Sequence, residues 1–88
     1  MSLQEQFDDA ADRVQTLSER PDNETMLELY GLFKQATEGD CTTKKPSRLK
    51  IRERAKHGAW EDKKGMAEDD AKQAYIDLVD RLVEEDGG

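Results

Sequence analysis

The chain has 88 residues, of which 14 are lysine or arginine and 21 are aspartate or glutamate, so its net charge is -7. A chain of this length forms one small domain, residues 1–88, which is too short to enclose a large catalytic core with a cofactor cavity, so any ligand is expected to lie largely on its surface. The charge is uneven, because residues 44–56 hold seven basic residues and one acidic residue, a balance of +6, which leaves -13 for the rest of the chain.

The first predicted element is a helix over residues 3–17. Its apolar residues fall on one face at helical spacing and are Leu3, Phe7, Ala10, Ala11, Val14 and Leu17. Ser2 and Glu5 form a capping-box pattern at its start, in which each side chain accepts a hydrogen bond from the backbone amide of the other residue. Arg20 and Pro21 then interrupt the helical pattern, because the residue before a proline is pushed out of helical geometry.

A second helix is predicted to follow Asp22, whose side chain can cap it, and to end at Gly39 in a left-handed conformation. Its apolar face is predicted to hold Met26, Leu29, Tyr30, Phe33, Ala36 and Thr37. Residues 40–50 show no apolar periodicity and include Pro46, so we expect an irregular connection that is long for a helical bundle.

Two further helices are predicted in the C-terminal half. The third spans residues 52–64, stops at Gly65 and has a weak apolar pattern of Ala55, Ala59 and Trp60. The fourth spans residues 68–85, and its apolar face holds Ala71, Ala74, Tyr75, Leu78, Val79 and Leu82. No segment alternates as a strand would, so the predicted fold class is all-α with four helices.

The sequence lacks the features of a membrane span, a disulfide, a metal site and two common catalytic or phosphate-binding motifs. No stretch reaches the ~18 apolar residues that a membrane span requires, so we expect a cytoplasmic protein without integral membrane association. Cys41 is the only cysteine, which rules out an internal disulfide and fits a reducing compartment. Because His57 is the only histidine, we expect no metal site. The chain also has no Gly-rich phosphate loop and no nucleophile elbow.

Two aromatic rings and an ammonium group share one face of the second predicted helix. Tyr30, Phe33 and Lys34 are spaced i, i+3 and i+4. An aromatic face offers stacking area to a flat ring, and Lys34 at its edge can reach an anionic group while it remains solvated. The same spacing is typical of two core residues flanked by a solvated lysine, so spacing alone does not distinguish the two interpretations.

Residues 44–56, called the basic segment below, supply more positive charge. Arg52 and Lys56 lie at i and i+4 at the start of the third predicted helix, and four further cations precede them: Lys44, Lys45, Arg48 and Lys50. A compact polyphosphate fits this segment better than a nucleic acid, because the charge of -13 elsewhere repels an extended polyanion. The alternative is a solvated stretch that exchanges salt bridges with acidic neighbours.

The run from Pro21 through Met26 to Asp40 resembles the signature of the acyl-CoA-binding protein family. The resemblance extends over essentially the whole chain, through Phe7-Asp8, Ala10-Ala11, Lys45-Pro46, Ala55-Lys56, Ala59-Trp60, Lys64-Gly65, Asp70-Ala71 and Ala74-Tyr75-Ile76-Asp77. It implies a four-helix up-down-down-up bundle with an overhand connection between the second and third helices. It also implies a monomeric, non-catalytic carrier that binds medium- to long-chain fatty acyl-CoA and needs no cofactor.

The resemblance also implies a set of ligand contacts. Carried over position by position, these are Gln15, Met26, Tyr30, Gly31, Leu32, Phe33, Lys34, Arg52, Lys56 and Tyr75. In the family, basic groups and tyrosine hydroxyls hold the 3'-phosphate of coenzyme A, and the aromatic residue at Phe33 flanks the adenine. The acyl chain is then expected to contact Met26, Leu27 and Ala11.

Some positions depart from the family pattern. The family usually has tyrosine at Phe33 and commonly lysine at Gln15, so one hydroxyl and one cation are absent from the pocket. His57 stands where a tryptophan is common, and we expect a partly exposed helical residue there. Lys63 stands where leucine is frequent. Cys41 occupies an apolar position and is expected to be a small buried side chain.

A second function of a different class is compatible with the sequence. The chain is then a helical interaction module whose basic segment binds an acidic partner or RNA, while the departures at Phe33, Gln15 and His57 degrade the acyl-CoA site. Binding to RNA that survives without acyl-CoA would distinguish this function from the carrier.

Overall fold

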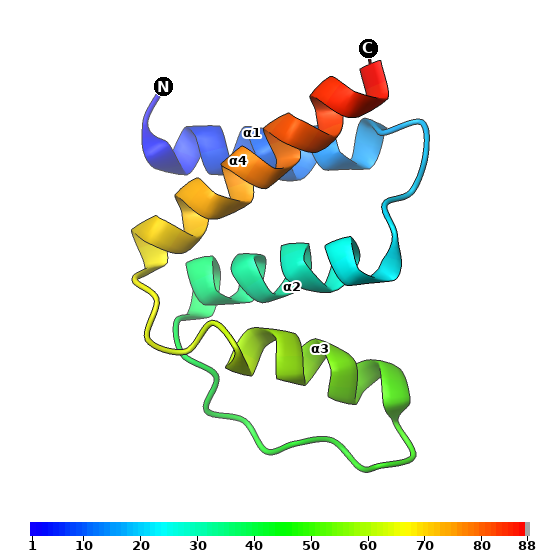
Figure 1. The fold of residues 1–88 in the computed structure, drawn as a ribbon. Helices are drawn as coiled ribbons and strands as arrows, with labels where there is room; N and C mark the ends of the chain where they lie inside the picture. The colour runs from blue at the N-terminus through cyan, green and yellow to red at the C-terminus, as the bar shows by residue number, and fades with distance from the viewer. Residues whose placement is uncertain (88) are drawn as a thin grey trace.

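The computed structural model describes residues 1–87, which form a bundle of helices. The helices are α1 (Leu3–Arg13), α2 (Asn23–Glu38), α3 (Ile51–Glu61) and α4 (Glu68–Gly87), and a short 3-10 helix, η1 (Val14–Thr16), follows α1 directly. Within the described range no residue forms a strand. Helices α1 and α4 run in one direction and α2 and α3 in the other (Figure 1). The all-α, up-down-down-up arrangement predicted from the sequence is therefore confirmed.

The helices pack in a chain of neighbours in which α4 contacts α1 and α2, and α2 also contacts α3. In the described part of the chain, α3 packs against no helix other than α2 (Figure 1). The long connection between α2 and α3 crosses outside α3 and allows these two consecutive helices to run parallel. It is the overhand connection expected from the sequence.

The main cluster of buried hydrophobic residues comes from α1, α2 and α4. Its buried residues are Phe7, Ala10, Leu29, Leu32, Ala36, Ala71, Tyr75, Ile76 and Val79. Full burial of one large apolar side chain stabilises a protein by about 1.5–3 kcal/mol, so the large members of this cluster each contribute on that scale. The apolar face predicted for the first helix contacts this core except at Leu17, and the whole apolar face predicted for the fourth helix contacts it.

The apolar face predicted for α2 was wrong at two positions. Phe33 and Thr37 are exposed, whereas Leu32 and Gln35 are buried. A single-face prediction fails here because α2 lies between α4 and α3 and buries residues toward both neighbours. One consequence is that Phe33 is available at the surface.

The close approach of α2 and α3 depends on a glycine. A Cβ atom at Gly31 would lie 2.5 Å from the backbone oxygen of Ala59, far inside van der Waals contact. Only a residue without a side chain allows the two helices to pack at this distance. Gly31 therefore fixes where α3 sits on α2.

The predicted caps at the starts of α1 and α2 are both present. The backbone amide of Glu5 donates to Ser2 Oγ and the amide of Ser2 donates to Glu5 Oε1, each at 3.1 Å. At α2, the amide of Thr25 donates to Asp22 Oδ1 at 2.8 Å. Each cap satisfies amide groups that have no partner inside the helix, a contribution of about 1 kcal/mol per cap.

The C-terminal ends of three helices differ from the prediction, and α4 ends at Gly87, two residues beyond its predicted end. The α-helical part of α1 ends at Arg13 instead of residue 17, and Leu17 is extended, with φ -61° and ψ 136°. Helix α3 ends at Glu61, three residues before the predicted end, and turns connect it to Gly65. The amides of Lys63 and Lys64 bond to carbonyls three residues earlier, which tightens this last turn beyond α-helical geometry.

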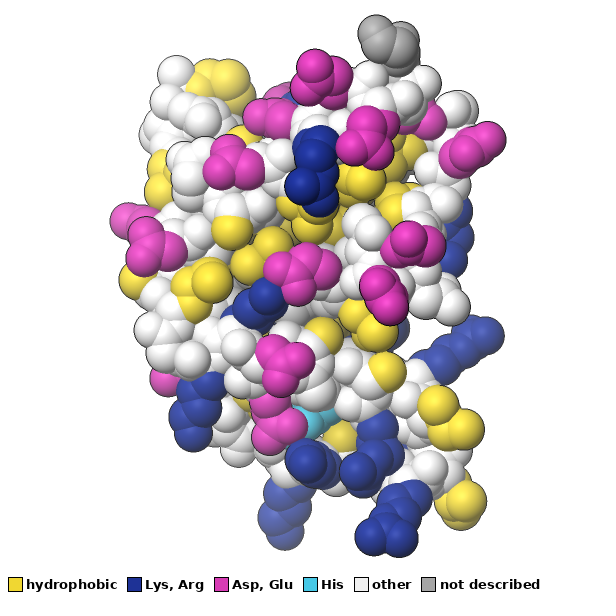
Figure 2. Space-filling view, viewed as in Figure 1, with side chains coloured by type: hydrophobic (Ala, Val, Ile, Leu, Met, Phe, Trp, Pro, Cys, Tyr) yellow, Lys and Arg dark blue, Asp and Glu magenta, His cyan; other side chains and the backbone are white. Residues whose placement is uncertain are grey.

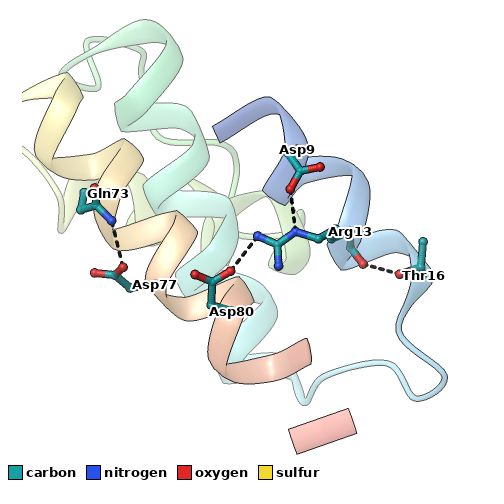
Figure 3. A network of polar contacts seen from close by, with 6 residues as sticks. All are labelled: Asp9, Arg13, Thr16, Gln73, Asp77 and Asp80. Atoms are coloured by element: carbon teal, nitrogen blue, oxygen red, sulfur yellow. Dashed lines mark hydrogen bonds and ion pairs between the residues drawn. The ribbon is translucent and has the colours of Figure 1, made fainter. Parts of the chain in front are cut away.

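Arg13 joins α1 to α4 at the end of the helix (Figure 3). Its guanidinium donates to Asp9 within α1 at 2.9 Å and to Asp80 of α4 at 2.7 Å. Thr16 Oγ1 donates to the carbonyl oxygen of Arg13 at 2.7 Å. This hydroxyl competes for a helical carbonyl group, which explains why the chain tightens into η1 instead of continuing as an α-helix.

Gly39 starts the overhand connection, which polar contacts then hold in place. Its φ is 78°, positive as predicted, but its ψ of -152° lies outside the left-handed helical region, in a part of conformational space that only glycine adopts readily. Trp60 Nε1 of α3 donates to the Gly39 carbonyl oxygen at 2.8 Å. The connection therefore leaves α2 along a path fixed by α3.

Gln35 and Asp40 tie the connection to the turn between α3 and α4. The buried amide of Gln35 donates to Asp40 Oδ1 at 2.8 Å and to the carbonyl oxygen of Met66 at 2.7 Å. Asp40 Oδ1 also accepts from the amide of Gly65 at 2.9 Å. The hydrogen bond from the Gly65 amide is the main cause that lowers the pKa of Asp40, and the hydrogen bond from Gln35 lowers it further.

Candidate ligand-binding site

Two adjoining grooves lie along α2. The first, called the apolar groove, has a volume of about 470 Å³ and is lined by Val14, Gln15, Leu17, Arg20, Pro21, Met26, Leu29, Tyr30, Phe33 and Tyr75. The second, called the polar groove, has a volume of about 330 Å³ and is lined by Tyr30, Lys34, Thr43, Lys44, Pro46, Glu53, Lys56, His57 and Trp60. Tyr30 lines both grooves, so they meet at its side chain.

The aromatic wall of the apolar groove is a cluster of three rings. The Phe7 and Phe33 rings stack with centroids 5.5 Å apart, and the Tyr75 ring lies 5.1 Å from Phe7 and 5.9 Å from Phe33. Phe7 and Tyr75 are buried, but 38% of Phe33 is exposed. The buried rings therefore support Phe33 from one side and leave its surface free for a flat ligand, which favours the ligand interpretation of this residue over the core interpretation.

Two lysines stand over aromatic rings in the polar groove. Lys56 Nζ lies 5.5 Å from the centroid of the Tyr30 ring, and Lys34 Nζ lies 4.8 Å from the centroid of the Trp60 ring. Lys34 also pairs with Glu38, and this hydrogen bond is the main cause that raises the pKa of Lys34. Lys34 of α2 and Lys56 of α3 thus both line the polar groove, where their ammonium groups are available to phosphate groups.

Burial raises the pKa of Tyr75 above its ordinary value. Its hydroxyl therefore stays protonated across the physiological range, and it can donate a hydrogen bond to an anionic ligand. Gln15 also lines the apolar groove and offers a neutral amide, whose Nε2 donates to the carbonyl oxygen of Ala11 at 3.5 Å.

The structure brings together seven of the ten contacts predicted from the sequence. The apolar groove contains Gln15, Met26, Tyr30, Phe33 and Tyr75, and the polar groove contains Tyr30, Lys34 and Lys56. Three predicted residues line neither groove. Arg52 is exposed on the first turn of α3, Leu32 is buried in the core, and Gly31 packs against Ala59.

Several groove residues were not predicted from the sequence. Trp60 lies four residues after Lys56 and so on the same face of α3, a signal that identifies it in hindsight. Glu53 lies three residues before Lys56 on α3, and the same spacing places it beside that lysine. Thr43 and Pro46 enter the polar groove only because the overhand connection folds across α3. No local pattern reports such a contact.

The predicted exposure of His57 was wrong. It was expected to be partly exposed, yet only 7% of it is accessible. Its Nε2 lies 2.9 Å from the carbonyl oxygen of Thr43 and 3.4 Å from Cys41 Sγ, and its Nδ1 lies 3.4 Å from Glu61 Oε1. The overhand connection covers this face of α3 and buries the imidazole. Cys41 is buried beside it, as predicted.

The basic segment is not neutralised by acidic neighbours. Within residues 1–87, none of its seven lysine and arginine side chains has a carboxylate within 4.0 Å. The salt-bridge exchange considered from the sequence is therefore absent among these residues. Lys63, just outside the segment, does pair with Glu28 of α2 at 2.7 Å, which explains how a lysine is accommodated at this position.

Two further properties of the described chain bear on the kind of site. No group of three histidine, cysteine, aspartate or glutamate side chains among the described residues is arranged to hold a metal ion. Over the same residues, no helix is long and apolar enough to cross a membrane.

The apolar groove meets the polar groove, with its lysines, at Tyr30. This arrangement is typical of a small helical protein that binds an amphipathic anion. Residues 4–79 match the family described as "Acyl CoA binding protein", and the chain belongs to this family, whose members are binding proteins without catalytic activity. The identity is 52% over 77 residues with acyl-CoA-binding protein homolog 1 of Caenorhabditis elegans, a match that covers 88% of this chain and 90% of that protein.

Other relatives and solved structures agree. An acyl-CoA-binding protein of Brassica napus is 44% identical over 96% of this chain and 91% of its own length. The crystal structure of Oryza sativa acyl-CoA-binding protein 2 superposes with a TM-score of 0.92 at 40% identity, covering 96% of this chain and 93% of that one. The crystal structure of ACBP from Moniliophthora perniciosa gives a TM-score of 0.90 at 29% identity, with coverage of 100% and 86%.

Proposed function

We propose that residues 1–88 are a single acyl-CoA-binding domain that binds medium- to long-chain fatty acyl-CoA thioesters and carries them without chemical conversion. The observation that carries this proposal is the meeting of the apolar and polar grooves at Tyr30. An acyl-CoA has the same two parts in one molecule, because an apolar chain is joined to a phosphate-rich head.

In this proposal the phosphates of coenzyme A bind at the polar groove. Lys34 and Lys56 supply charge-assisted hydrogen bonds, which are about twice as strong as those between neutral groups. The adenine lies against the exposed ring of Phe33, and the hydroxyls of Tyr30 and Tyr75 act as further donors. Arg52 acts at longer range, as a charge that attracts the ligand, since it lines neither groove.

The acyl chain follows the apolar groove past Met26. Each methylene group removed from water contributes about 0.8 kcal/mol, so affinity rises with chain length until the groove is filled. Phe33 and Gln15 lack a hydroxyl and a cation that the family usually provides at these positions. This site therefore relies on Lys34 and Lys56 for most of its phosphate contact.

Isothermal titration with palmitoyl-CoA tests the proposal, with free coenzyme A and palmitate as controls. We expect saturable binding of the thioester, and weaker binding of either part alone because each part makes only some of the contacts of the whole ligand. The absence of saturable palmitoyl-CoA binding in this titration would contradict the proposed function.

The proposed carrier is a monomer in the cytoplasm and has no nucleic-acid partner. A reducing compartment suits the single free thiol of Cys41. The excess of acidic residues outside the basic segment opposes binding of a long polyanion. Sedimentation equilibrium with and without palmitoyl-CoA checks the monomeric state, and a mass that doubles with the ligand would contradict it.

A further inference from the structure

The corner where the overhand connection enters α3 exposes two large aliphatic side chains. Leu49 is 91% exposed and Ile51 is 77% exposed, and neither lines the apolar or the polar groove. An isolated exposed aliphatic residue is common on protein surfaces. Two that are separated by a single residue, on the protruding end of the molecule, need an explanation that the ligand site does not provide.

Cations surround these two side chains in the sequence. Arg48, Lys50 and Arg52 alternate with Leu49 and Ile51, and all three are exposed. Lys44 and Lys45 of the same connection are exposed as well. We call residues 44–52 the tip. Its cations have no acidic partner in the described chain, so their charge is available to another molecule.

Basic and acidic side chains are unevenly distributed on the face of the molecule shown in Figure 2. Figure 2 shows basic side chains gathered at the lower end, where α3 and the overhand connection lie, with hydrophobic side chains among them. Most acidic side chains of the same view lie above this end. An extended anionic surface therefore attracts the tip and repels the opposite end, which fixes the orientation of the protein on that surface.

We propose that the tip docks on a lipid bilayer that contains anionic lipids, with Leu49 and Ile51 inserted at the boundary between headgroups and acyl chains. The transfer of aliphatic side chains from water to an apolar phase is favourable, and so is the attraction of clustered cations to an anionic leaflet. The tip offers both contributions in a single exposed segment.

A bilayer fits these residues better than RNA or an acidic protein. Proteins bind single-stranded RNA by stacking its bases on aromatic or arginine side chains, so RNA explains the arginines of the tip, but it offers Leu49 and Ile51 no apolar phase to enter. An acidic protein partner explains the cations of the tip, but it gives the two protruding aliphatic side chains no apolar phase to enter.

Docking through the tip also orients the ligand site. Lys44 belongs to both the tip and the polar groove, so the polar groove opens beside the docked face. A protein bound in this way holds its phosphate-binding groove next to the headgroups of the membrane. The docking itself does not require a bound ligand, so it can be tested separately from the proposed function.

Flotation of the ligand-free protein with vesicles tests the proposal. We expect the protein to float with vesicles of phosphatidylcholine and phosphatidylserine, to remain unbound with pure phosphatidylcholine, and to dissociate as salt is raised. Absence of binding to the phosphatidylserine vesicles at low salt would overturn the proposal.

Two pairs of substitutions separate the apolar and the charged contributions. Leu49→Ser with Ile51→Ser should lower partitioning to anionic vesicles about tenfold or more, because the inserted apolar groups are lost. Arg48→Glu with Lys50→Glu should abolish it. The matched control is Lys64→Glu with Arg81→Glu, which changes the net charge equally at exposed positions outside the tip and should retain most of the binding.

Circular dichroism and palmitoyl-CoA titration confirm that each variant is folded, which is expected because all substituted side chains are exposed. Leu49→Trp adds a direct readout of insertion, since its fluorescence should shift to the blue on anionic vesicles while the buried Trp60 contributes a constant background. Unchanged flotation of the Leu49 and Ile51 pair would contradict insertion. Fluorescence of the Leu49→Trp variant that does not shift on anionic vesicles would also contradict insertion. Binding of RNA that is unaffected by Leu49→Ser with Ile51→Ser, together with no binding to vesicles, would favour RNA as the partner of the tip and overturn the proposal.

Discussion

The two sides of α2 are built from different interactions. On one side, α1, α2 and α4 share an apolar core that includes Phe7, Leu32 and Val79. On the other side, α3 is held by the close approach at Gly31 and by individual polar contacts such as Trp60 Nε1 to the Gly39 carbonyl oxygen. Stability is therefore concentrated on the first side, whereas the second side keeps cationic side chains at the surface.

The site lies where these two sides meet. Tyr30 on α2 faces the apolar groove, which borders the core, and the polar groove, which borders α3. This arrangement suits a ligand with an apolar and an anionic part. Substitutions on the two sides should have separable effects on stability and on binding.

The largest expected effect is on the core side. Leu32→Ala should lower the free energy of unfolding by about 2–5 kcal/mol, because a side chain that is only 2% exposed leaves a cavity. The matched control is Leu49→Ala, the same change at an exposed position, which should alter stability by less than about 0.5 kcal/mol. Urea denaturation of both variants measures the difference. Equal losses in the two variants would contradict the assignment of the core.

A glycine pair tests the packing of α3 on α2. Gly31→Ala should cost about 1–3 kcal/mol, since the new Cβ would overlap the backbone of Ala59 and force the helices apart. Gly58→Ala on α3 is the control, because its Cβ would meet nothing within 4 Å. That change should stabilise the helix by about 0.5–1 kcal/mol. Opposite signs in urea denaturation are the predicted result, and a loss in both variants would count against this packing.

Lys56 tests the polar groove. Lys56→Ala should weaken palmitoyl-CoA binding by more than about 1 kcal/mol through loss of a charged contact, with little change in stability. Tyr30→Ala should weaken binding by a similar amount, because both grooves lose a wall. Lys64→Ala is the matched control, since this exposed lysine lies outside both grooves, and titration calorimetry should show wild-type affinity. Wild-type affinity in Lys56→Ala as well would remove Lys56 from the site.

The smallest expected effect concerns Asp40, which ties the overhand connection to Gly65. Its pKa is lowered in the folded protein, so its contribution to stability is present above its unfolded pKa and is lost as pH falls through the folded value. Asp40→Asn should therefore be less stable than wild type at neutral pH, and the difference should shrink in acid. Thermal unfolding across this pH range measures it. A difference that stays constant with pH would show that Asp40 is not the titrating group.

Much of the fold could be predicted because its determinants are local. Residues within a few positions of one another determine the caps at Ser2 and Asp22. They also determine the apolar faces of the first and fourth helices. The direction of the four helices followed from the family resemblance.

The errors arise where distant segments meet. The burial of His57 depends on residues 41–43 folding over α3, and the two buried faces of α2 depend on packing against both α3 and α4. Among the site residues, Arg52 lies on the exposed first turn of α3 and lines neither groove, so its role as a ligand contact stays a prediction. Sequence spacing reports a helix face and does not report what covers that face.

The most direct test of a single site built from two grooves is an affinity series of acyl-CoA thioesters of increasing chain length, measured by calorimetry on wild type and Lys56→Ala. Affinity should rise by up to about 0.8 kcal/mol per methylene until the apolar groove is filled. Lys56→Ala should lower every affinity in the series by the same factor, because the phosphate contact is separate from the acyl contact. Affinity that does not change with chain length, or a Lys56→Ala effect that disappears for long chains, would contradict this arrangement.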